Sequence, residues 1–273
     1  MDILTKTAAG LAADLFLSSK GINPARPSLS FLERLTRAFA SIPYENITKI
    51  VRFHEQSEWE NRLRLPQDVI KEHVDYQAGG TCFSLTFCLD KILGHLGFKT
   101  RIAMADMPSG TNLHCAVIIE TDSGIHLADP GYLQPCPLPV PSQGSLTAQG
   151  GSSPIRLDRS GDVIALSTIA PGGEKQRYLL KDIPLSQEDF IGHWIRSFDY
   201  PMQNGILVTA LRGSTHLYLH NNHFRATCGD HVEKDNVRQG YGERIEKAFG
   251  IQASLAEKAR DILRSRGTSR IKA

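Results

Sequence analysis

The sequence predicts an α+β protein in three parts: a helical bundle, a β-barrel or sandwich, and a third region of mixed α/β structure. Apolar residues recur at helical spacing over the first 97 residues, and the period then changes to that of strands. Turn signals at Ser160-Gly161 and Asn221-Asn222 predict further hairpins, and the chain ends in a helical pattern. We therefore expect domains over residues 1–97, 98–200 and 201–273.

The bulk composition excludes several classes of protein. The 273 residues suffice for a large core, and 41% hydrophobic with 22% charged residues is ordinary for a soluble globular protein. A net charge of +2 without a basic stripe argues against a nucleic-acid partner. No apolar run has the length of a signal or membrane segment, so we expect a cytoplasmic protein without a membrane partner. Five irregularly spaced cysteines, with no Cys-x-x-Cys, argue against a disulfide framework and structural zinc.

Helix signals in the first region place one cysteine at a helix start. Ser30 to Glu33 fits a capping box, and residues 67–75 fit a further helix. Residues 79–81, Gly-Gly-Thr, lead into a strong apolar stripe that stops at Gly97. The stripe consists of Leu85, Leu89, Ile92, Leu93 and Leu96. Cys82 therefore falls in the first turn of a helix.

Strand signals follow directly. Residues 99–107, 114–120 and 125–129 are rich in Ile, Val, Ala and Leu, and residues 121–124 form a turn signal between the last two. Residues 130–154 hold many Pro, Gly and Ser residues. That segment is long for a plain connection, which suggests that part of it covers a site.

Cys82 has the placement of an activated nucleophile. A cysteine attacks as the thiolate, and its free pKa near 8.5 leaves little thiolate at neutral pH. A helix N-terminus stabilises the anion through free N–H groups and the helix dipole. Gly79 and Gly80 would let the backbone turn tightly and let a substrate approach, and the N–H of Cys82 could donate to an oxyanion. Taken alone, a cysteine at this position is more often a small buried residue.

His114 and Asp129 fit the base and the acid that such a nucleophile needs. A hairpin turning at Asp122-Ser123 places Ala116 opposite Asp129, with His114 as the diagonal neighbour on the same face. A three-residue loop would put the two on opposite faces. The carboxylate would fix the tautomer of the imidazole and support its charged form. Separately, the two residues would be a core histidine and a turn residue, so the conjunction with Cys82 favours a catalytic triad.

These residues resemble the arylamine N-acetyltransferase family. That family carries an Arg-Gly-Gly-x-Cys segment, a later histidine on a strand, and an Asp-x-Gly-Phe segment. In this chain, residues 79–82 read Gly-Gly-Thr-Cys and residues 129–132 read Asp-Pro-Gly-Tyr, with His114 between them. The fifteen positions from His114 to Asp129 also match. Residues 42–47, Ile-Pro-Tyr-Glu-Asn-Ile, are similar to the family's Pro-Phe-Glu-Asn-Leu. Weaker echoes at residues 199–204 and 248–251 extend the resemblance over roughly residues 10 to 251.

The resemblance implies a fold and a reaction. The fold is an N-terminal helical bundle, a central β-barrel and a C-terminal α/β lid around a core like that of cysteine proteases and transglutaminases. In the reaction, a ping-pong transfer, Cys82 takes the acetyl group from acetyl-CoA as a thioester and passes it to an arylamine or hydrazine. Acetyl-CoA is thus a co-substrate, and no bound cofactor or metal is expected. The candidate substrate contacts are Tyr44, Phe83, Gly131 and Tyr132; core packing is the alternative for the two tyrosines.

The chain also departs from the family pattern. The Arg before Gly-Gly is replaced by Ala78, which Gln77 precedes. The family's Cys-x-Glu-x-Asn is replaced by Cys-Phe-Ser-Leu-Thr at residues 82–86. The second Gly of Asp-x-Gly-Phe-Gly is replaced by Leu133. Glu45, the partner of the lost Arg, then needs another partner, such as Arg62 or Arg64, or stays exposed. The change to Thr86 removes an Asn that supports the triad.

Three alternatives stay open. The same triad could serve an amide synthase that takes its acyl group from a thioester on an acyl carrier protein, or a hydrolase of the peptidase or transglutaminase kind. The scaffold could also serve as a non-catalytic binding protein. A zinc site at His216, His220 and His223 is less favoured, because an Asn-Asn hairpin with exposed histidines accounts for them.

Overall fold

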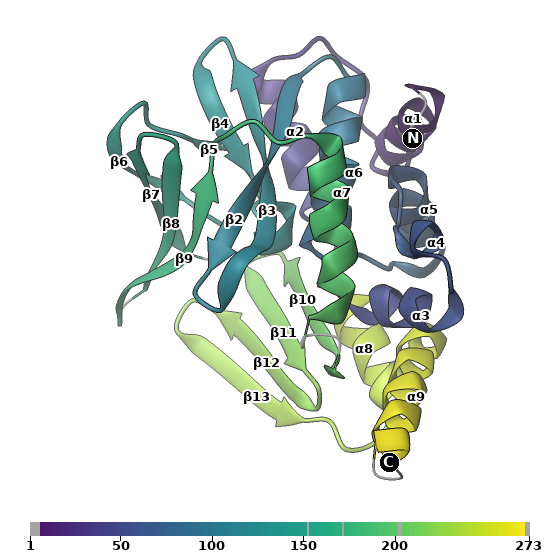
Figure 1. Ribbon diagram of the computed structural model, residues 1–273. Coiled ribbons are helices and arrows are strands. Elements are labelled where there is room, and N and C mark those ends of the chain that lie inside the picture. The colour runs from purple at the N-terminus through teal and green to yellow at the C-terminus, as the bar shows by residue number, and fades with distance from the viewer. Residues whose placement is uncertain (1–5, 152, 171, 201–203, 271–273) are drawn as a thin grey trace.

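The computed structural model describes residues 6–151, 153–170, 172–200 and 204–270. The fold consists of two antiparallel sheets and two groups of helices, and the helix that begins at Cys82 lies between the other N-terminal helices and the larger sheet (Figure 1). The N-terminal region is helical, as predicted, with α1 (Lys6–Ser19), α2 (Leu29–Phe39), α3 (Ile47–Glu55), α4 (Trp59–Arg62), α5 (Pro66–Tyr76) and α6 (Cys82–His95). Helices α1 and α5 pack on α6.

The start of α2 differs from the predicted capping box. Ser28, not Ser30, is the N-cap, because its extended backbone (φ −158°, ψ 160°) lets its hydroxyl accept the N–H of Phe31 at 3.2 Å. Ser30 already lies inside the helix. The predicted box was therefore wrong by two residues, although the helix itself is present.

The central sheet has eight antiparallel strands and is nearly closed, like a barrel. In chain order the strands are β2 (Lys99–Met107), β3 (Gly110–Thr121), β4 (Gly124–Ala128), β5 (Leu138–Pro139), β6 (Gly144–Gln149), β7 (Pro154–Ser160), β8 (Val163–Ala170) and β9 (Gly173–Lys181). Their order in the sheet is β5-β4-β3-β2-β9-β8-β7-β6. Strands β5 and β6 belong to the segment 130–154, so part of that segment is regular structure.

The hairpin of β3 and β4 has the predicted register. Thr121 pairs with Gly124 and Val117 with Ala128, so the turn consists of Asp122 and Ser123. Successive residues of β3 are buried on opposite faces: Val117 and its alternates pack with α6, whereas Ile118 lies in the barrel interior. Strand β3 therefore joins the helical core to the barrel core.

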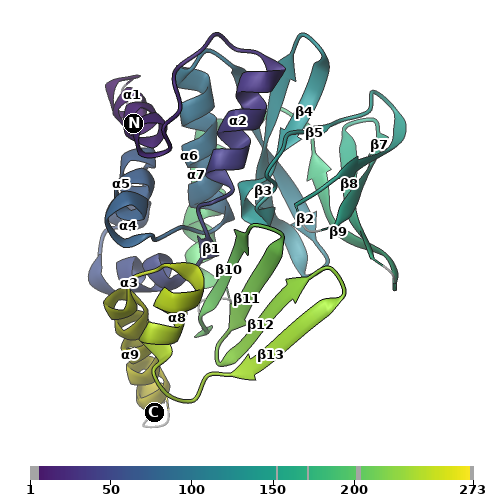
Figure 2. The same ribbon diagram turned by 180° about the vertical axis from the view of Figure 1, so that it is seen from behind.

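The C-terminal region holds the second sheet. It consists of β10 (Leu207–Arg212), β11 (Thr215–His220), β12 (His223–Cys228) and β13 (His231–Asn236), flanked by α8 (Tyr241–Phe249) and α9 (Ala253–Arg270). Strand β1 (Tyr44–Glu45), from the N-terminal region, pairs with β10 (Figure 2). The division at residues 97 and 200 thus stays a prediction, and residues 201–203 of the family-like segment 199–204 lie outside the described residues.

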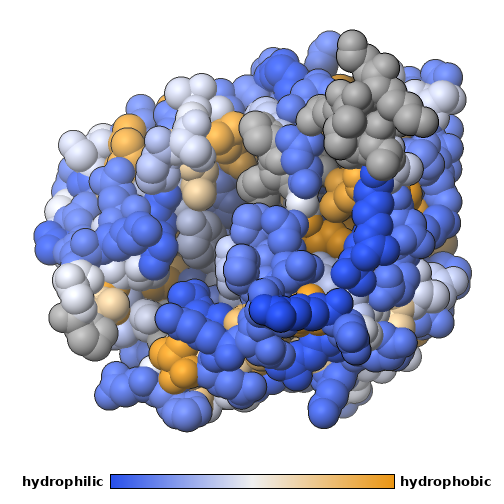
Figure 3. Space-filling model, turned by 90° about the horizontal axis from the view of Figure 1, so that it is seen from below, coloured by the Kyte–Doolittle hydropathy of each residue, from blue (hydrophilic) through white to orange (hydrophobic). Residues whose placement is uncertain are grey.

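Helix α7 (Gln187–Arg196) connects the two sheets and packs on α6. The ring of Phe190 lies 5.8 Å from that of Phe87, and the ring of Trp194 lies 5.5 Å from it. A 3-10 turn, η2 (Ser197–Asp199), follows α7. On the face seen from below, hydrophilic residues predominate and apolar residues form small separate spots (Figure 3). Among the described helices, none combines the length and apolar character needed to cross a bilayer.

His73 holds the segment before Cys82 in place by a hydrogen bond to its backbone. It is buried, one ring nitrogen lies 2.9 Å from the carbonyl of Ala78, and the other lies 2.9 Å from Nζ of Lys20. Because an ammonium only donates, Nε2 accepts from Lys20 and Nδ1–H donates to Ala78. Burial, followed by the charge of Lys20, lowers the pKa of His73 to about 4. The ring is therefore neutral at neutral pH.

Acid is expected to destabilise the protein through His73. Its pKa is lower in the folded state than the unfolded value of 6.5, so its contribution is complete above pH 6.5 and is lost as the pH falls through about 4. Between pH 7 and pH 5 the free energy of unfolding should fall by about 2 kcal/mol from this group. Urea unfolding at both pH values, compared with a His73→Gln variant, measures it; equal pH dependence in the two proteins would contradict the prediction.

Candidate active site

Cys82 is the first residue of α6, as predicted, and only 6% of its surface is exposed. Close contacts account for the two glycines before it. A Cβ on Gly79 would lie 1.7 Å from the carbonyl oxygen of Pro43, and a Cβ on Gly80 would clash with Oγ of Ser84. The N–H of Gly80 also donates to the carbonyl oxygen of Pro43 at 3.3 Å. Lack of space for a side chain, rather than a left-handed turn, therefore accounts for Gly-Gly at this point. The free N–H groups of the first helical turn surround the sulfur-bearing residue.

His114 and Asp129 meet beside Cys82. Nε2 of His114 lies 2.9 Å from Oδ2 of Asp129, and both side chains are buried. Asp129 directly follows β4 and caps the 3-10 turn η1 (Pro130–Tyr132), where its Oδ1 accepts the N–H of Tyr132 at 3.1 Å. The side chain of His114 also interacts with Cys82 by hydrogen bonding and charge, and this interaction lowers the pKa of the Cys82 thiol. The structure therefore brings together three side chains that are 47 positions apart in sequence.

Tyr178 is a member of this cluster that sequence reasoning missed. It lies on β9, is fully buried, and its hydroxyl donates to Oδ2 of Asp129 at 2.6 Å. Its ring centre lies 4.8 Å from that of His114. Asp129 thus accepts from two side chains at one oxygen, which fixes its carboxylate plane. No sequence motif marks Tyr178, because it reaches the site through the pairing of β9 with β2.

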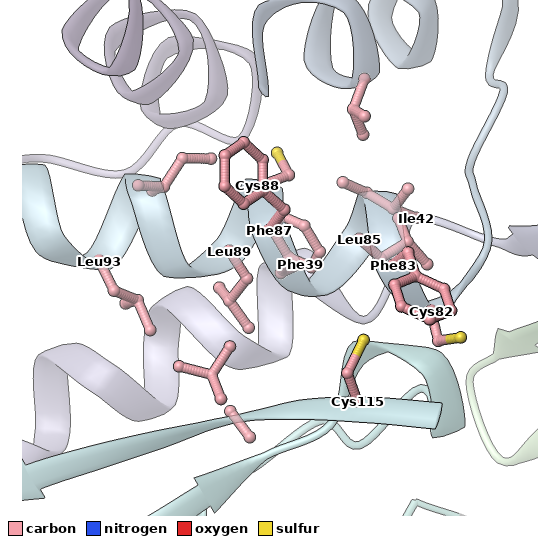
Figure 4. Packing of buried hydrophobic residues seen from close by; sticks show 14 of the residues in the cluster. Phe39, Ile42, Cys82, Phe83, Leu85, Phe87, Cys88, Leu89, Leu93 and Cys115 are labelled. Atoms are coloured by element: carbon pink, nitrogen blue, oxygen red, sulfur yellow. The ribbon is translucent and has the colours of Figure 1, made fainter. Parts of the chain in front are cut away.

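The electrostatic environment favours a thiolate–imidazolium pair. A hydrogen bond from the thiol of Cys115 holds the pKa of Cys82 well below its usual range; burial opposes this, and His114 and Lys49 reinforce it. Burial opposes the charge on His114, but the charge of Asp129 and its hydrogen bond outweigh burial and raise the pKa of His114 to about 10. Burial raises the pKa of Cys115, so that side chain stays a thiol and a donor. Figure 4 shows Cys115 extending from its strand toward the start of the helix that carries Cys82.

Arg64 takes the place of the Arg that the family carries before Gly-Gly. Its Nη1 lies 3.7 Å from Oε1 of Glu45, its Nε donates to Glu72 at 2.9 Å, and it also donates to the carbonyl of Gly79. Glu45 is completely buried and accepts two hydrogen bonds from Thr48. Of the two partners expected for Glu45, Arg64 is therefore the one that the structure supplies.

The other two departures also have structural partners. The hydroxyl of Thr86 donates to the carbonyl of Cys115 at 3.0 Å and so ties α6 to the strand that carries His114. Leu133 ends η1 with φ of 53°, in the left-handed region where glycine is usual. Such a conformation costs about 1 kcal/mol or more for leucine, and burial of its side chain in the helical core offsets that cost.

The four candidate substrate-contact residues differ in their surroundings and in how near they lie to His114. The ring of Tyr132 meets that of His114 edge-on at 5.2 Å, and Tyr44 is buried on β1 beside Gly80. Phe83 is 1% exposed, and its ring lies 5.7 Å from that of Phe190 in the helical core. Tyr132 thus lies beside His114, whereas Phe83 has the surroundings of a packing residue.

Gly131 lies between the members of the cluster. A Cβ there would lie 2.8 Å from Cε1 of His114, 3.0 Å from Cβ of Cys82 and 3.3 Å from Oδ1 of Asp129. A methyl group would therefore push the imidazole and the sulfur apart.

A Gly131→Ala variant is expected to lower kcat/KM for acyl transfer by about 10²-fold, because a shift of this size misaligns the reacting groups. Circular dichroism should show an unchanged fold. Gly192→Ala is the matched control, since the nearest side-chain atom that a Cβ there would meet is Nη1 of Arg196 at 3.6 Å. Full activity of the Gly131 variant would contradict the prediction.

The histidines on the C-terminal sheet have other partners. Nε2 of His216 lies 2.8 Å from the hydroxyl of Thr209, and His220 pairs with His223 across the hairpin of β11 and β12. In the ranges that the structure describes, no group of three or more His, Cys, Asp or Glu side chains could hold a metal ion.

A family model described as N-acetyltransferase matches residues 28–258. No curated protein matches the chain by sequence. The chain is similar to an arylamine N-acetyltransferase from Salmonella typhimurium (TM-score 0.77, 17% identity, 93% of this chain and 98% of that chain). It is also similar to one from Nocardia farcinica (0.77, 18%, 96% and 97%) and to that of Mycobacterium marinum in complex with CoA (0.78, 16%, 92% and 98%).

At such low identity the structural likeness establishes the fold, and the helical bundle and barrel expected from the resemblance are confirmed. The family model covers well over half of the chain and identifies an acetyltransferase enzyme. The chain therefore belongs to the arylamine N-acetyltransferase family.

Proposed function

We propose that Cys82, His114 and Asp129 form a catalytic triad that carries an acetyl group from acetyl-CoA to an arylamine or hydrazine by a ping-pong mechanism. The observation that carries the proposal is the hydrogen-bonded chain from Asp129 through His114 to a cysteine at a helix start. The CoA complex of the Mycobacterium marinum relative supports acetyl-CoA as the donor. The aromatic ring of Tyr132, beside His114, supports an aromatic acceptor.

In the first half-reaction the Cys82 thiolate attacks the carbonyl carbon of the acetyl thioester. The new C–S bond forms as the C–S bond to CoA breaks, and the CoA sulfur leaves with the proton of the His114 imidazolium. The N–H of Cys82, at the free end of α6, is positioned to stabilise the developing oxyanion. The products are acetyl-Cys82, neutral His114 and free CoA.

In the second half-reaction the acceptor nitrogen attacks the acetyl carbon. His114 takes a proton from the nitrogen, the C–S bond breaks, and the electron pair returns to the sulfur of Cys82. Asp129 holds Nε2–H of His114 throughout, so that Nδ1 is the nitrogen that exchanges the proton. The triad thus returns to its thiolate–imidazolium form.

Intact-protein mass spectrometry after incubation with acetyl-CoA tests the proposal. We expect one added acetyl group, located at Cys82 by peptide mapping and removed by an arylamine with release of the N-acetyl product. The exposed Cys228 provides the matched control, because a Cys228→Ala variant should be labelled equally.

Other outcomes separate the alternatives. Loss of the adduct to water without amine would favour a hydrolase, and labelling only by other acyl thioesters, including carrier-bound ones, would favour another donor. No adduct from any thioester would leave the proposal without its covalent intermediate.

A further inference from the structure

Lys49 is a buried cation with neutral partners. It lies in α3, and only 7% of its surface is exposed. Its Nζ donates to the carbonyl oxygen and to the hydroxyl of Ser197, at 2.8 and 2.7 Å, and lies 4.5 Å from the ring centre of Phe198. Asp199 acts on it at longer range. Within the described ranges, no carboxylate lies within ion-pair distance of Lys49.

A buried ammonium without a paired anion costs free energy, so its charge needs an explanation. Burial lowers the pKa of Lys49 to about 8, and the charges of Cys82 and Asp199 oppose that shift. The side chain therefore remains mostly protonated at neutral pH. An apolar residue of similar length would fill the space beside Phe198 without this cost.

Lys49 lies close to the start of α6, the helix that carries Cys82. It lines a small cavity together with Thr81 and Ser84 at that helix start. The other residues that line the cavity are Thr48, Arg62, Arg64, Trp194 and Phe198. Cys82 follows Thr81 directly. The charged forms of Lys49 and Cys82 stabilise each other, as the directions of both interactions require.

Resting on the proposed role of Cys82 as nucleophile, we propose that Lys49 is a positioning residue whose buried ammonium, beside the residues that flank Cys82, stabilises the Cys82 thiolate. The thiolate then has two buried cations, His114 on one side and Lys49 on another. In the acetylated enzyme the sulfur is neutral and the ammonium has lost its anion. Lys49 therefore favours the return of the electron pair to sulfur when the amine attacks, and its effect is felt in both half-reactions.

Several titratable groups act on Cys82, and the test must separate Lys49 from them. The groups are His114 and Cys115 on β3, Lys49 on α3, Tyr44 on β1, Tyr132 on η1, and Tyr200 after η2; Asp199 acts on Lys49 itself. Among them, Lys49 alone is a lysine, so its charge can be removed or kept by substitutions that leave the others in place.

The rate of Cys82 alkylation by iodoacetamide as a function of pH provides the test, with the modified cysteine identified by peptide mass spectrometry. Lys49→Met removes the charge, Lys49→Gln removes it but keeps an N–H donor for Ser197, and Lys49→Arg keeps it. Lys20→Met is the control, because Lys20 is a partly buried lysine that bonds to Ser41 and His73 instead. Circular dichroism checks each fold.

We expect the midpoint of the wild-type profile well below the ordinary cysteine pKa, and a rise of about one pH unit in both uncharged variants. Lys49→Arg and Lys20→Met should keep the wild-type midpoint. Unchanged midpoints in folded Lys49→Gln, with a low wild-type midpoint, overturn the inference about Lys49 alone. An ordinary midpoint in the wild type would instead count against the proposed nucleophile, so the two failures are distinct.

Discussion

The Cys82→Ser variant is expected to lose acyl transfer by about 10³-fold or more while keeping its fold. The hydroxyl stays protonated in a site whose hydrogen bonds and cations are tuned for a thiolate. The substitution changes one buried atom, so the packing around α6 should persist. Steady-state assays with acetyl-CoA and an arylamine, together with thermal unfolding, measure both effects.

Cys88→Ser is the matched control for that variant. Cys88 lies on the same helix two turns away, is fully buried, and its pKa is raised by burial. Its loss should reduce stability and leave kcat unchanged. If the Cys82 variant kept wild-type turnover, the covalent route would be wrong.

Replacing the acid of the proposed triad should have an effect of similar size. In an Asp129→Asn variant the amide oxygen can keep the bond from the N–H of Tyr132 in the place of Oδ1. The amide nitrogen then takes the place of Oδ2 and faces Nε2 of His114 and the hydroxyl of Tyr178. Because that nitrogen donates, the imidazole would carry its proton on Nδ1 and could no longer accept one from Cys82. We expect kcat/KM to fall by about 10³ to 10⁴-fold.

The Tyr178→Phe variant tests whether Asp129 acts through its negative charge or through the orientation of its carboxylate. It removes one hydrogen bond to the carboxylate and keeps the charge, so a loss of about tenfold is expected in kcat/KM. The alkylation profile of Cys82 should shift to higher pH in Asp129→Asn and stay near that of the wild type in Tyr178→Phe. Equal profiles in all three proteins would show that Asp129 does not control the imidazole.

Local sequence patterns predicted the helix that carries Cys82, the hairpin that carries His114, and the position of Asp129 after that hairpin. The turn at Asp122-Ser123 fixed the register that brings His114 to Asp129, because strand parity depends only on the length of the turn. The apolar stripe that stops at Gly97 likewise predicted α6. These features depend on residues that lie within about thirty positions of one another, and contacts at that range leave a recognisable pattern in the sequence.

The parts that sequence reasoning missed depend on distant contacts. Tyr178 reaches Asp129 across 49 positions and Lys49 reaches Ser197 across 148, and neither has a motif of its own. Arg64 could be named only as one of two partners for Glu45, since charge complementarity limits the choice without fixing the geometry. The true cap of α2, Ser28, was missed because Phe31 stands three residues after it, whereas Ser30 has Glu33 at that distance and so fits the capping-box pattern.

The short strand β1 couples the start of the chain to its end. The N–H of Glu45 donates to Gly80, two residues before Cys82, while Asn46 bonds to Gly205 and Leu207 across 159 and 161 positions. Closing so large a loop is slow compared with forming the local helices. We therefore expect the segment that leads to Cys82 to gain its last backbone contacts only after β10 has formed, so that the environment proposed to activate Cys82 is completed late in folding.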